Sequence, residues 1–316
     1  MASELLSILI RLNLVAGGAI VAVLMLRPHI RRGFGPHATY ALWVLVPFAT
    51  LGALMPAADG GGAAGPVELA QGHAEIWLAE GGHAAWLIGA WALGVAVSGG
   101  LAALRYRQFV ARARAGQAGP AILGVFCPRI VTPSDFRTRF SEEERRLVLA
   151  HERAHMDRLD ARWNALALAL QCLNWFNPLA YAALRAMRFD QELACDATVL
   201  EGLPEQRRRY AEALLRTFEG GTASPLGCGW GGGALAPVVT RLTALMRRPP
   251  DDGRRETGYA VMSALFMAAF VAGWAAQAPY RRPLIPQLIT VDLTPHYWEG
   301  VQPLVTPREI GPKAPS

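Results

Sequence analysis

The chain has 316 residues, 52% of them hydrophobic, and a mean hydropathy of +0.21. This composition is too apolar for an ordinary soluble domain and indicates membrane-spanning segments. The formal net charge is +6, but the basic residues are unevenly distributed along the chain, so their positions are more informative than the total.

Four segments are predicted as membrane-spanning helices, because a span requires about 20 mostly apolar residues. In chain order they are 5–26, 38–55, 84–104 and 258–278. Only the acidic Glu4 precedes the first apolar run, so the positive region of a signal peptide is missing and a retained helix is predicted.

The arginines predict the orientation of these helices, since cytoplasmic flanks collect Lys and Arg. Arginines occur in the connection 27–37 and at both ends of 105–257, whereas the connection 57–83 contains four acidic residues and no Lys or Arg. The N-terminus, 57–83 and the tail 279–316 are therefore predicted to lie outside the inner (plasma) membrane. The connection 27–37 and the region 105–257 are predicted to be cytoplasmic.

The predicted domains follow from this arrangement. A three-helix membrane region covers 1–104, a cytoplasmic domain covers 105–257, the fourth helix covers 258–278, and a short extracytoplasmic tail covers 279–316. The tail is rich in Pro and has no clear core, so it is expected to be extended or disordered. The loop 57–65, "AADGGGAAG", is predicted to be a flexible linker.

A metal-binding pattern occurs in the cytoplasmic segment, on a stretch, 141–175, that is predicted to be one long helix. His151 and His155 are four residues apart, so both imidazoles lie on one helix face at the spacing of two zinc ligands. Glu152 is placed to act on an attacking water rather than on the metal. The alternative is a solvated, charged helix face, because this pattern arises by chance in a chain of this length with a probability on the order of one per cent.

Ser141 and Glu144 form a capping-box pattern that marks the start of this helix. A second helix is predicted over about 179–200, after a turn at "NWFNPL". In an antiparallel hairpin about that turn, Glu192 faces His155 and is the predicted third ligand.

Asp196, one turn after Glu192, is predicted to accept a hydrogen bond from a ligand imidazole. The alternative for these two carboxylates is pairing with Arg185 or Arg188. Two histidines and one carboxylate with a fourth position open are typical of catalytic zinc. Zn²⁺ is therefore the predicted cofactor, and Glu152 is the predicted general base.

Two features are left open by the sequence. The donor to the developing oxyanion is one of Tyr181, Tyr210 and several arginines. The four cysteines form no CxxC pair and are expected to be reduced, small, buried residues; they are Cys127, Cys172, Cys195 and Cys228.

The motifs around this predicted site are similar to those of a known family. "RIVTP", "SEEERRLVLAHERAHMDRLD", "NWFNPL" and "MRFDQELACD" resemble the BlaR/MecR family of membrane-embedded antirepressor zinc metallopeptidases. The resemblance is dense over about 80 residues, and the four-span layout extends it over most of the chain.

The resemblance implies a mainly α fold, with a gluzincin-like α+β protease core between the third and fourth spans and a strand segment at 121–133. It implies His151, His155 and Glu192 as zinc ligands, Glu152 as the catalytic base, and Asp160 and Asp196 as supporting acids. The best-known members continue into a penicillin-binding sensor domain, whereas only about 38 residues follow the fourth predicted span here, without an SxxK motif.

The implied function is signal transduction by cleavage of a cytoplasmic winged-helix repressor. The expected partners are that substrate, the lipid bilayer and a sensor protein contacting the tail or outer loop; direct nucleic-acid binding is not expected. Two alternatives remain: a housekeeping membrane protease similar to the HtpX/Ste24 type, and a non-catalytic receptor with a protease-like fold.

Overall fold

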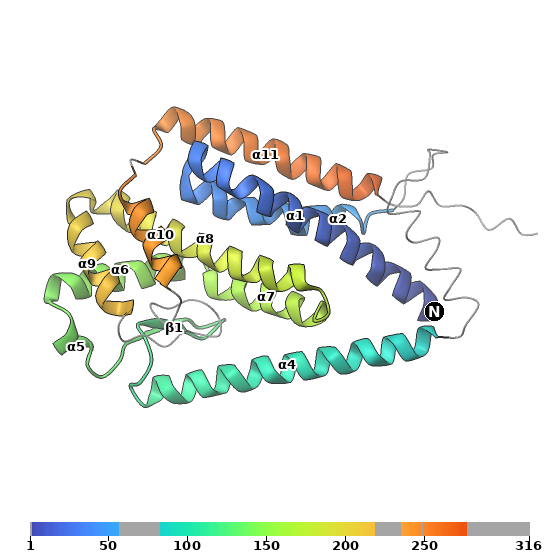
Figure 1. Cartoon of the computed structure of the whole chain (residues 1–316), viewed down its shortest axis with the longest axis horizontal. Helices are drawn as coiled ribbons and strands as arrows, with labels where there is room; N and C mark the ends of the chain where they lie inside the picture. Colours follow the sequence, from blue (N-terminus) through green and yellow to red (C-terminus); the bar gives the residue numbers. More distant parts are fainter. Residues whose placement is uncertain (1, 57–82, 219–234, 248, 277–316) are drawn as a thin grey trace, which may run out of the picture. The chain divides into compact units, whose positions relative to one another are not determined.

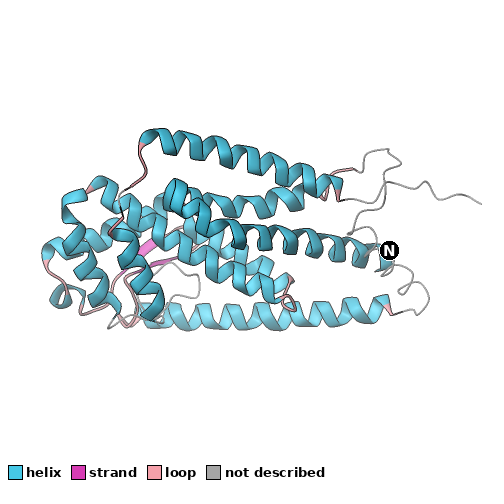
Figure 2. Cartoon of the chain, turned by 45° about the horizontal axis from the view of Figure 1, so that its top comes forward, coloured by secondary structure: helices cyan, strands magenta, loops and turns pink. Residues whose placement is uncertain are grey.

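The computed structural model describes residues 2–56, 83–218, 235–247 and 249–276. They lie in one compact unit, Met1–Pro279, which is mainly helical with one small sheet (Figure 1, Figure 2). The predicted linker 57–65 and the tail 279–316 lie outside the described residues.

The N-terminal helices form a folded-back pair. α1 (Ala2–Ala41) leads through η1 (Leu42–Val44) into α2 (Leu45–Gly52), which lies beside the first part of α1 in Figure 1. The helical path of α1 breaks at Gly35, where φ is 86° and ψ is −176°. This backbone conformation is open essentially only to glycine, so Gly35 is where the chain can reverse.

Three described helices are long and apolar enough to cross a membrane: Leu5–Gly52, Ala85–Arg114 and Asp252–Ala275. The first has 48 residues, more than twice the roughly 20 that one span requires, and it contains the break at Gly35. The predicted spans 5–26 and 38–55 lie on either side of that break. The four-span layout and its orientation stay predictions.

The other two spans differ from their predicted bounds. α4 (Ala84–Arg114) continues ten residues beyond the predicted end at 104, and α11 (Asp252–Ala275) begins before 258. Both extensions are rich in arginine, which has a good helix propensity, and Asp251 caps α11 by accepting from the Arg254 amide at 2.8 Å. The sequence-based bounds at 104 and 258 therefore mark where the apolar residues end, whereas the helices themselves continue further. Residues 277 and 278 lie outside the described part.

α2 and α11 approach each other closely. A Cβ on Gly52 would lie 2.1 Å from the Phe270 carbonyl oxygen, and a Cβ on Gly273 would lie 2.0 Å from that of Ala49. Small residues that let two backbones meet are characteristic of helix packing in membranes.

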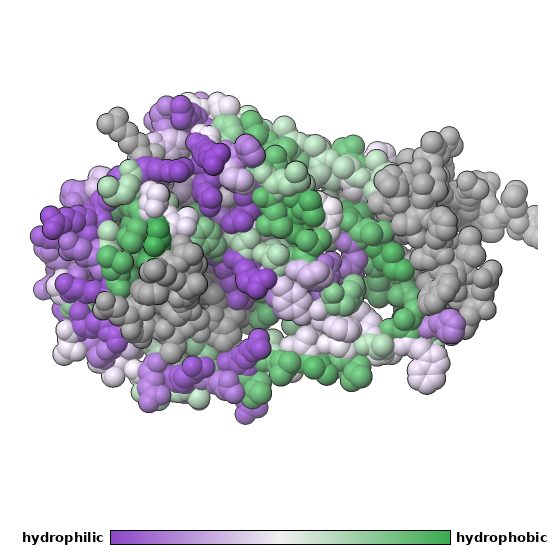
Figure 3. All heavy atoms as spheres, viewed as in Figure 1, coloured by the Kyte–Doolittle hydropathy of each residue, from purple (hydrophilic) through white to green (hydrophobic). Residues whose placement is uncertain are grey.

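Hydrophobic side chains cover much of the helical region seen in Figure 3, and hydrophilic ones gather at the end formed by α5, α6 and α9.

The strand segment predicted at 121–133 forms two short strands instead of one. β1 (Ala121–Leu123) and β2 (Arg129–Val131) pair antiparallel, with Ile122 opposite Ile130. The chain turns between them at Gly124, whose φ is 96°. The sheet packs against α6, which carries the HExxH motif.

The predicted long helix 141–175 is wrong, because the chain forms two helices there. α6 (Glu142–Asp157) begins with the predicted capping box, in which Ser141 and Glu144 hydrogen-bond reciprocally, and α7 (Asp160–Leu173) follows a break. Leu159 at the break has a positive φ of 59°. No Gly or Pro marks this position in the sequence, so the break could not be predicted from helix-stopping residues.

The remaining described elements pack around α6 or around the helices that contact it. They are α5 (Phe136–Arg139), α8 (Pro178–Gly202), η2 (Pro204–Gln206), α9 (Arg207–Phe218) and α10 (Leu235–Leu245). A buried cluster that includes Phe140, Val148, Val199, Leu214 and Leu245 joins α6, α8, α9 and α10. This packing fixes the position of the HExxH helix relative to α8.

Candidate metal centre

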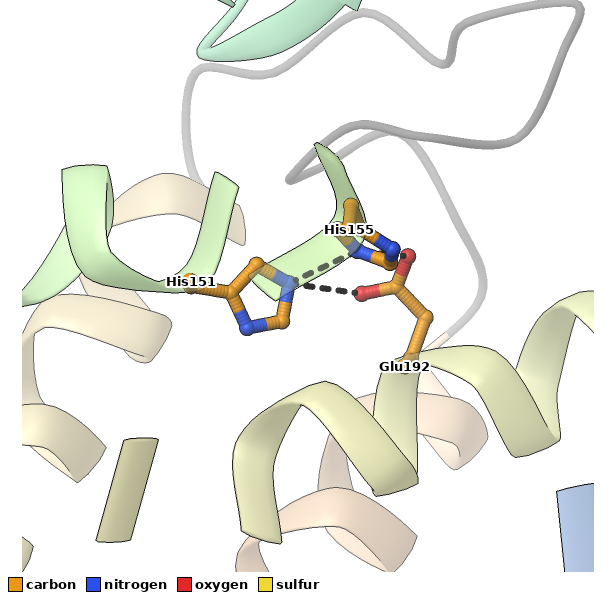
Figure 4. A group of neighbouring side chains, drawn as sticks. All are labelled: His151, His155 and Glu192. Carbon is orange, nitrogen blue, oxygen red and sulfur yellow. Dashed lines mark hydrogen bonds and ion pairs between the residues drawn. The ribbon is translucent and has the colours of Figure 1, made fainter. Parts of the chain in front are cut away.

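Three predicted ligands converge between α6 and α8. His151 and His155 project from one face of α6, and their Nε2 atoms are 3.1 Å apart. Glu192 on α8 lies 3.4 Å from His151 Nε2 and 3.5 Å from His155 Nε2 (Figure 4). Both imidazoles are fully buried.

Asp160 determines which nitrogen of His155 carries a proton. Its Oδ2 lies 2.8 Å from His155 Nδ1, and because a carboxylate only accepts hydrogen bonds, the proton belongs to Nδ1. The Nε2 atom, which faces Glu192, is then left with a lone pair. The break at Leu159 makes this contact possible, since residues five apart in an unbroken helix lie about 140° from each other around the axis.

A second chain of hydrogen bonds orients His151. The Tyr210 hydroxyl donates to Asp196 Oδ1 at 2.6 Å and lies 2.7 Å from His151 Nδ1. Because the hydroxyl proton points to Asp196, its oxygen accepts from Nδ1–H. The Nε2 atom of His151 therefore also presents a lone pair towards Glu192.

The converging groups fit a divalent cation. Two imidazole lone pairs and a carboxylate meet with no donor proton among them. The three groups make three close approaches, and one added proton could form a hydrogen bond across only one of these. Ligand atoms of tetrahedral zinc, bound at 2.0–2.1 Å, lie about 3.3 Å apart. The separations of 3.1, 3.4 and 3.5 Å agree with that value.

Glu152 lies beside these ligands but, unlike them, makes no hydrogen bond with its carboxylate to the described residues. It is fully buried, and neither of its carboxylate oxygens has a hydrogen-bond partner among the described residues. Burial raises the pKa of Glu152, because desolvation disfavours its charged form. A buried carboxylate held ready without a partner is suited to proton transfer, as expected of a general base.

Arg241 on α10 is a site residue that the sequence analysis missed. Its guanidinium forms two hydrogen bonds with Asp196, at 2.6 and 2.8 Å, and an ion pair with Glu192 at 2.8 Å. Burial alone would raise the pKa of Asp196, but the charge of Arg241 lowers it to about 2. Arg241 lowers the pKa of Glu192 as well, against the same effect of burial. Both carboxylates are thus kept ionised.

The alternative pairing of the two carboxylates with Arg185 or Arg188 is replaced by this pairing with Arg241. Arg241 is the only charged residue in the apolar sequence of α10. A single charge in an apolar helix is a signal of a buried counter-ion that the sequence does offer.

A second group of possible ligands, His155 Nδ1, Asp160 and Cys195, fits hydrogen bonding better than metal binding. The 2.8 Å between His155 Nδ1 and Asp160 Oδ2 is a hydrogen-bond length, below the roughly 3.3 Å between ligands of tetrahedral zinc. Cys195 is buried beside them, as expected. Cys127 is exposed, contrary to expectation, and Cys228 lies outside the described residues.

Two tyrosines were candidates for the oxyanion donor. The Tyr181 hydroxyl donates to the Trp175 carbonyl oxygen at 2.9 Å. The Tyr210 hydroxyl is engaged on the Nδ1 side of His151, away from the converging Nε2 atoms. Neither tyrosine is therefore positioned for that role in this structure.

Comparison with known proteins identifies the segment that contains this site. The sequence model of the BlaR1 peptidase M56 family matches residues 107–245, which include α6 and α8. This match and the curated relatives place that segment in the BlaR/MecR family. No solved structure is significantly similar to the chain.

Two curated members of the BlaR/MecR family show the extent of the similarity. Regulatory protein BlaR1 of Bacillus licheniformis is 27% identical over 157 residues, which are 49% of this chain and 26% of that protein. The methicillin resistance mecR1 protein of Staphylococcus aureus is 30% identical over 98 residues, 31% of this chain and 17% of that protein. The matched region thus covers about a quarter or less of these relatives.

Proposed function

We propose that the chain is an integral membrane zinc metalloendopeptidase that acts in signal transduction by cleaving a cytoplasmic transcriptional repressor. The observation that carries the peptidase proposal is the convergence of His151, His155 and Glu192 beside the buried, unpartnered carboxylate of Glu152. Membership of a family that includes a regulatory protein and a resistance protein supports the signalling role.

The proposed chemistry divides the work among these residues. The two imidazoles and Glu192 hold zinc, which when bound activates water and polarises the scissile carbonyl. Glu152 takes the proton from the attacking water and delivers it to the leaving amine. Asp160 and Tyr210 hold the imidazoles with Nε2 free to bind, and Arg241 keeps the carboxylates ionised.

The membrane location and topology belong to the same proposal. The three apolar helices and the family membership support a membrane protein, and the arginine distribution supports a cytoplasmic peptidase segment with external termini. The repressor substrate would then meet the site from the cytoplasm.

The test separates chemistry from metal binding. Glu152→Gln keeps the size of the side chain but removes its basicity, so this variant should fold, retain zinc and lose about 10²–10⁴-fold or more in peptidase rate. The rate is measured on a co-expressed candidate repressor, and zinc is measured on the same preparation. His155→Ala is the matched control that should lose both zinc and activity.

Wild-type cleavage by zinc-loaded Glu152→Gln would contradict the catalytic role. An inactive wild-type protein that still binds zinc would favour the receptor alternative. Cleavage of unrelated membrane proteins, with the repressor spared, would favour a housekeeping protease.

A further inference from the structure

The supports of the metal centre extend beyond the matched peptidase segment. Asp160, which is fully buried, uses Oδ2 for His155 and receives a hydrogen bond on Oδ1 from the Tyr40 hydroxyl at 3.0 Å. Tyr40 belongs to α1, 120 residues earlier in the chain. One phenol from the N-terminal helix pair is therefore two hydrogen bonds away from the proposed ligand His155.

The same hydroxyl also contacts the other ligand-bearing helix. Gln191 Nε2 donates to the Tyr40 oxygen at 2.9 Å, and Gln191 is the fully buried neighbour of Glu192 on α8. Tyr40 thus joins the support of His155 to the backbone that carries Glu192. The Arg158 guanidinium covers its ring, 4.4 Å from the centroid, and holds the phenol in this position.

A buried ion pair, one residue before Gln191, fixes α8 against the N-terminal helices. Asp190, fully buried, receives two hydrogen bonds from Arg27 at 2.6 and 2.8 Å and one from the Trp43 indole at 2.8 Å. Arg27 also donates to the Ala186 carbonyl oxygen at 3.2 Å. A bidentate arginine–carboxylate pair imposes a definite geometry, so α1 and α8 are held in one register beside Glu192.

We propose that Tyr40 is a positioning residue of the metal centre, through which the N-terminal helix pair controls how firmly His155 and Glu192 hold the metal. The inference rests on the proposed zinc site. Carboxylates behind a ligand histidine set its tautomer and orientation, and their loss weakens metal binding by about 10–100-fold. Tyr40 fixes one such carboxylate, so a displacement of α1 relative to α8 acts directly on the ligands.

The test is Tyr40→Phe in the full chain, purified in detergent. This change removes the hydroxyl and keeps the ring beneath Arg158. The zinc Kd, measured by chelator competition, should rise about 10-fold, the lower end of the range for outer supports of a ligand. The visible absorption bands of the cobalt-substituted protein should also change. Tyr259→Phe, a control at a 70% exposed position on α11, should alter neither.

A double-variant comparison shows whether Tyr40 acts through Asp160. In an Asp160→Asn background, Tyr40→Phe should have little further effect on zinc affinity, because the group through which it acts has been altered. Two effects that simply add in free energy would overturn the positioning role. Unchanged affinity and an unchanged cobalt spectrum in Tyr40→Phe would overturn it as well.

The outcomes also distinguish this inference from the proposed function. A wild-type protein that binds neither zinc nor cobalt would refute the metal centre itself, whereas zinc binding that is insensitive to Tyr40→Phe would refute only the role of Tyr40. Should Tyr40→Phe fail to fold, as judged by circular dichroism, Gln191→Met tests the same link. It removes the donor to the Tyr40 oxygen and should weaken zinc binding a few-fold, and unchanged affinity there would overturn the inference.

Discussion

Replacing Arg241 by Met removes the positive charge between the two carboxylates of α8. Arg241 is 6% exposed and forms three short contacts with Asp196 and Glu192. Loss of one partner of a buried ion pair costs about 3–5 kcal/mol, because the other charge stays buried without compensation. At about 2.1 cal/mol/K per residue, a chain of 316 residues has an unfolding entropy of about 0.66 kcal/mol/K. Each kcal/mol therefore lowers the unfolding midpoint by about 1.5 °C, and the metal-free protein should lose about 5–8 °C.

Zinc should reduce this loss, since its charge compensates Glu192 in place of the guanidinium. The assay is thermal unfolding of the detergent-solubilised protein, followed by circular dichroism with zinc and with a chelator. Arg208→Met is the control: Arg208 pairs with Glu212 at the surface, its side chain is 91% exposed, and such pairs contribute about 0–1 kcal/mol. Equal midpoint changes for both variants, or a loss at Arg241 that zinc does not reduce, would refute the reasoning.

The two remaining predictions concern the helices that are proposed to cross the membrane. Gly273→Leu should force α2 and α11 apart at Ala49 and lower the unfolding midpoint, because overpacking costs about 1–3 kcal/mol or more. Gly89→Leu is the control, since no atom lies within 4 Å of the added Cβ and the midpoint should not change. Equal midpoints for the two variants would show that the close contact is dispensable. A phosphatase fused after residue 316 and a fluorescent protein inserted within 219–234 should report opposite sides of the membrane, and same-side signals would reject the proposed orientation.

Local sequence patterns were sufficient for the parts of the site that lie on one helix. The i,i+4 spacing placed His151 and His155 on one face, and the capping box marked the start of α6. Pro178 follows Asn177, whose side chain caps α8. The predicted proximity of Glu192 to His155 agrees with the structure, although its premise, one unbroken helix, was wrong.

Interactions between distant segments could not be predicted in the same way. No glycine in the sequence marks the helix break at Leu159. The break brings Asp160 within hydrogen-bond distance of His155. Arg241 and Tyr40 reach the site from α10 and α1, and no spacing rule connects residues so far apart in sequence. Their roles depend on how whole helices pack, which is decided by the complete core rather than by any local pattern.

The close contact between α2 and α11 has a consequence for synthesis of the protein. All the residues that surround the metal position, from Tyr40 to Arg241, precede α11 in the chain. The ribosome therefore completes every part of the centre before the helix that packs against Gly52 and Ala49 exists. In the proposed topology, one face of α2 has only lipid as its neighbour until α11 enters the bilayer. The nascent chain would then pass through a stage in which the residues of the proposed metal centre are complete and the proposed membrane bundle is not.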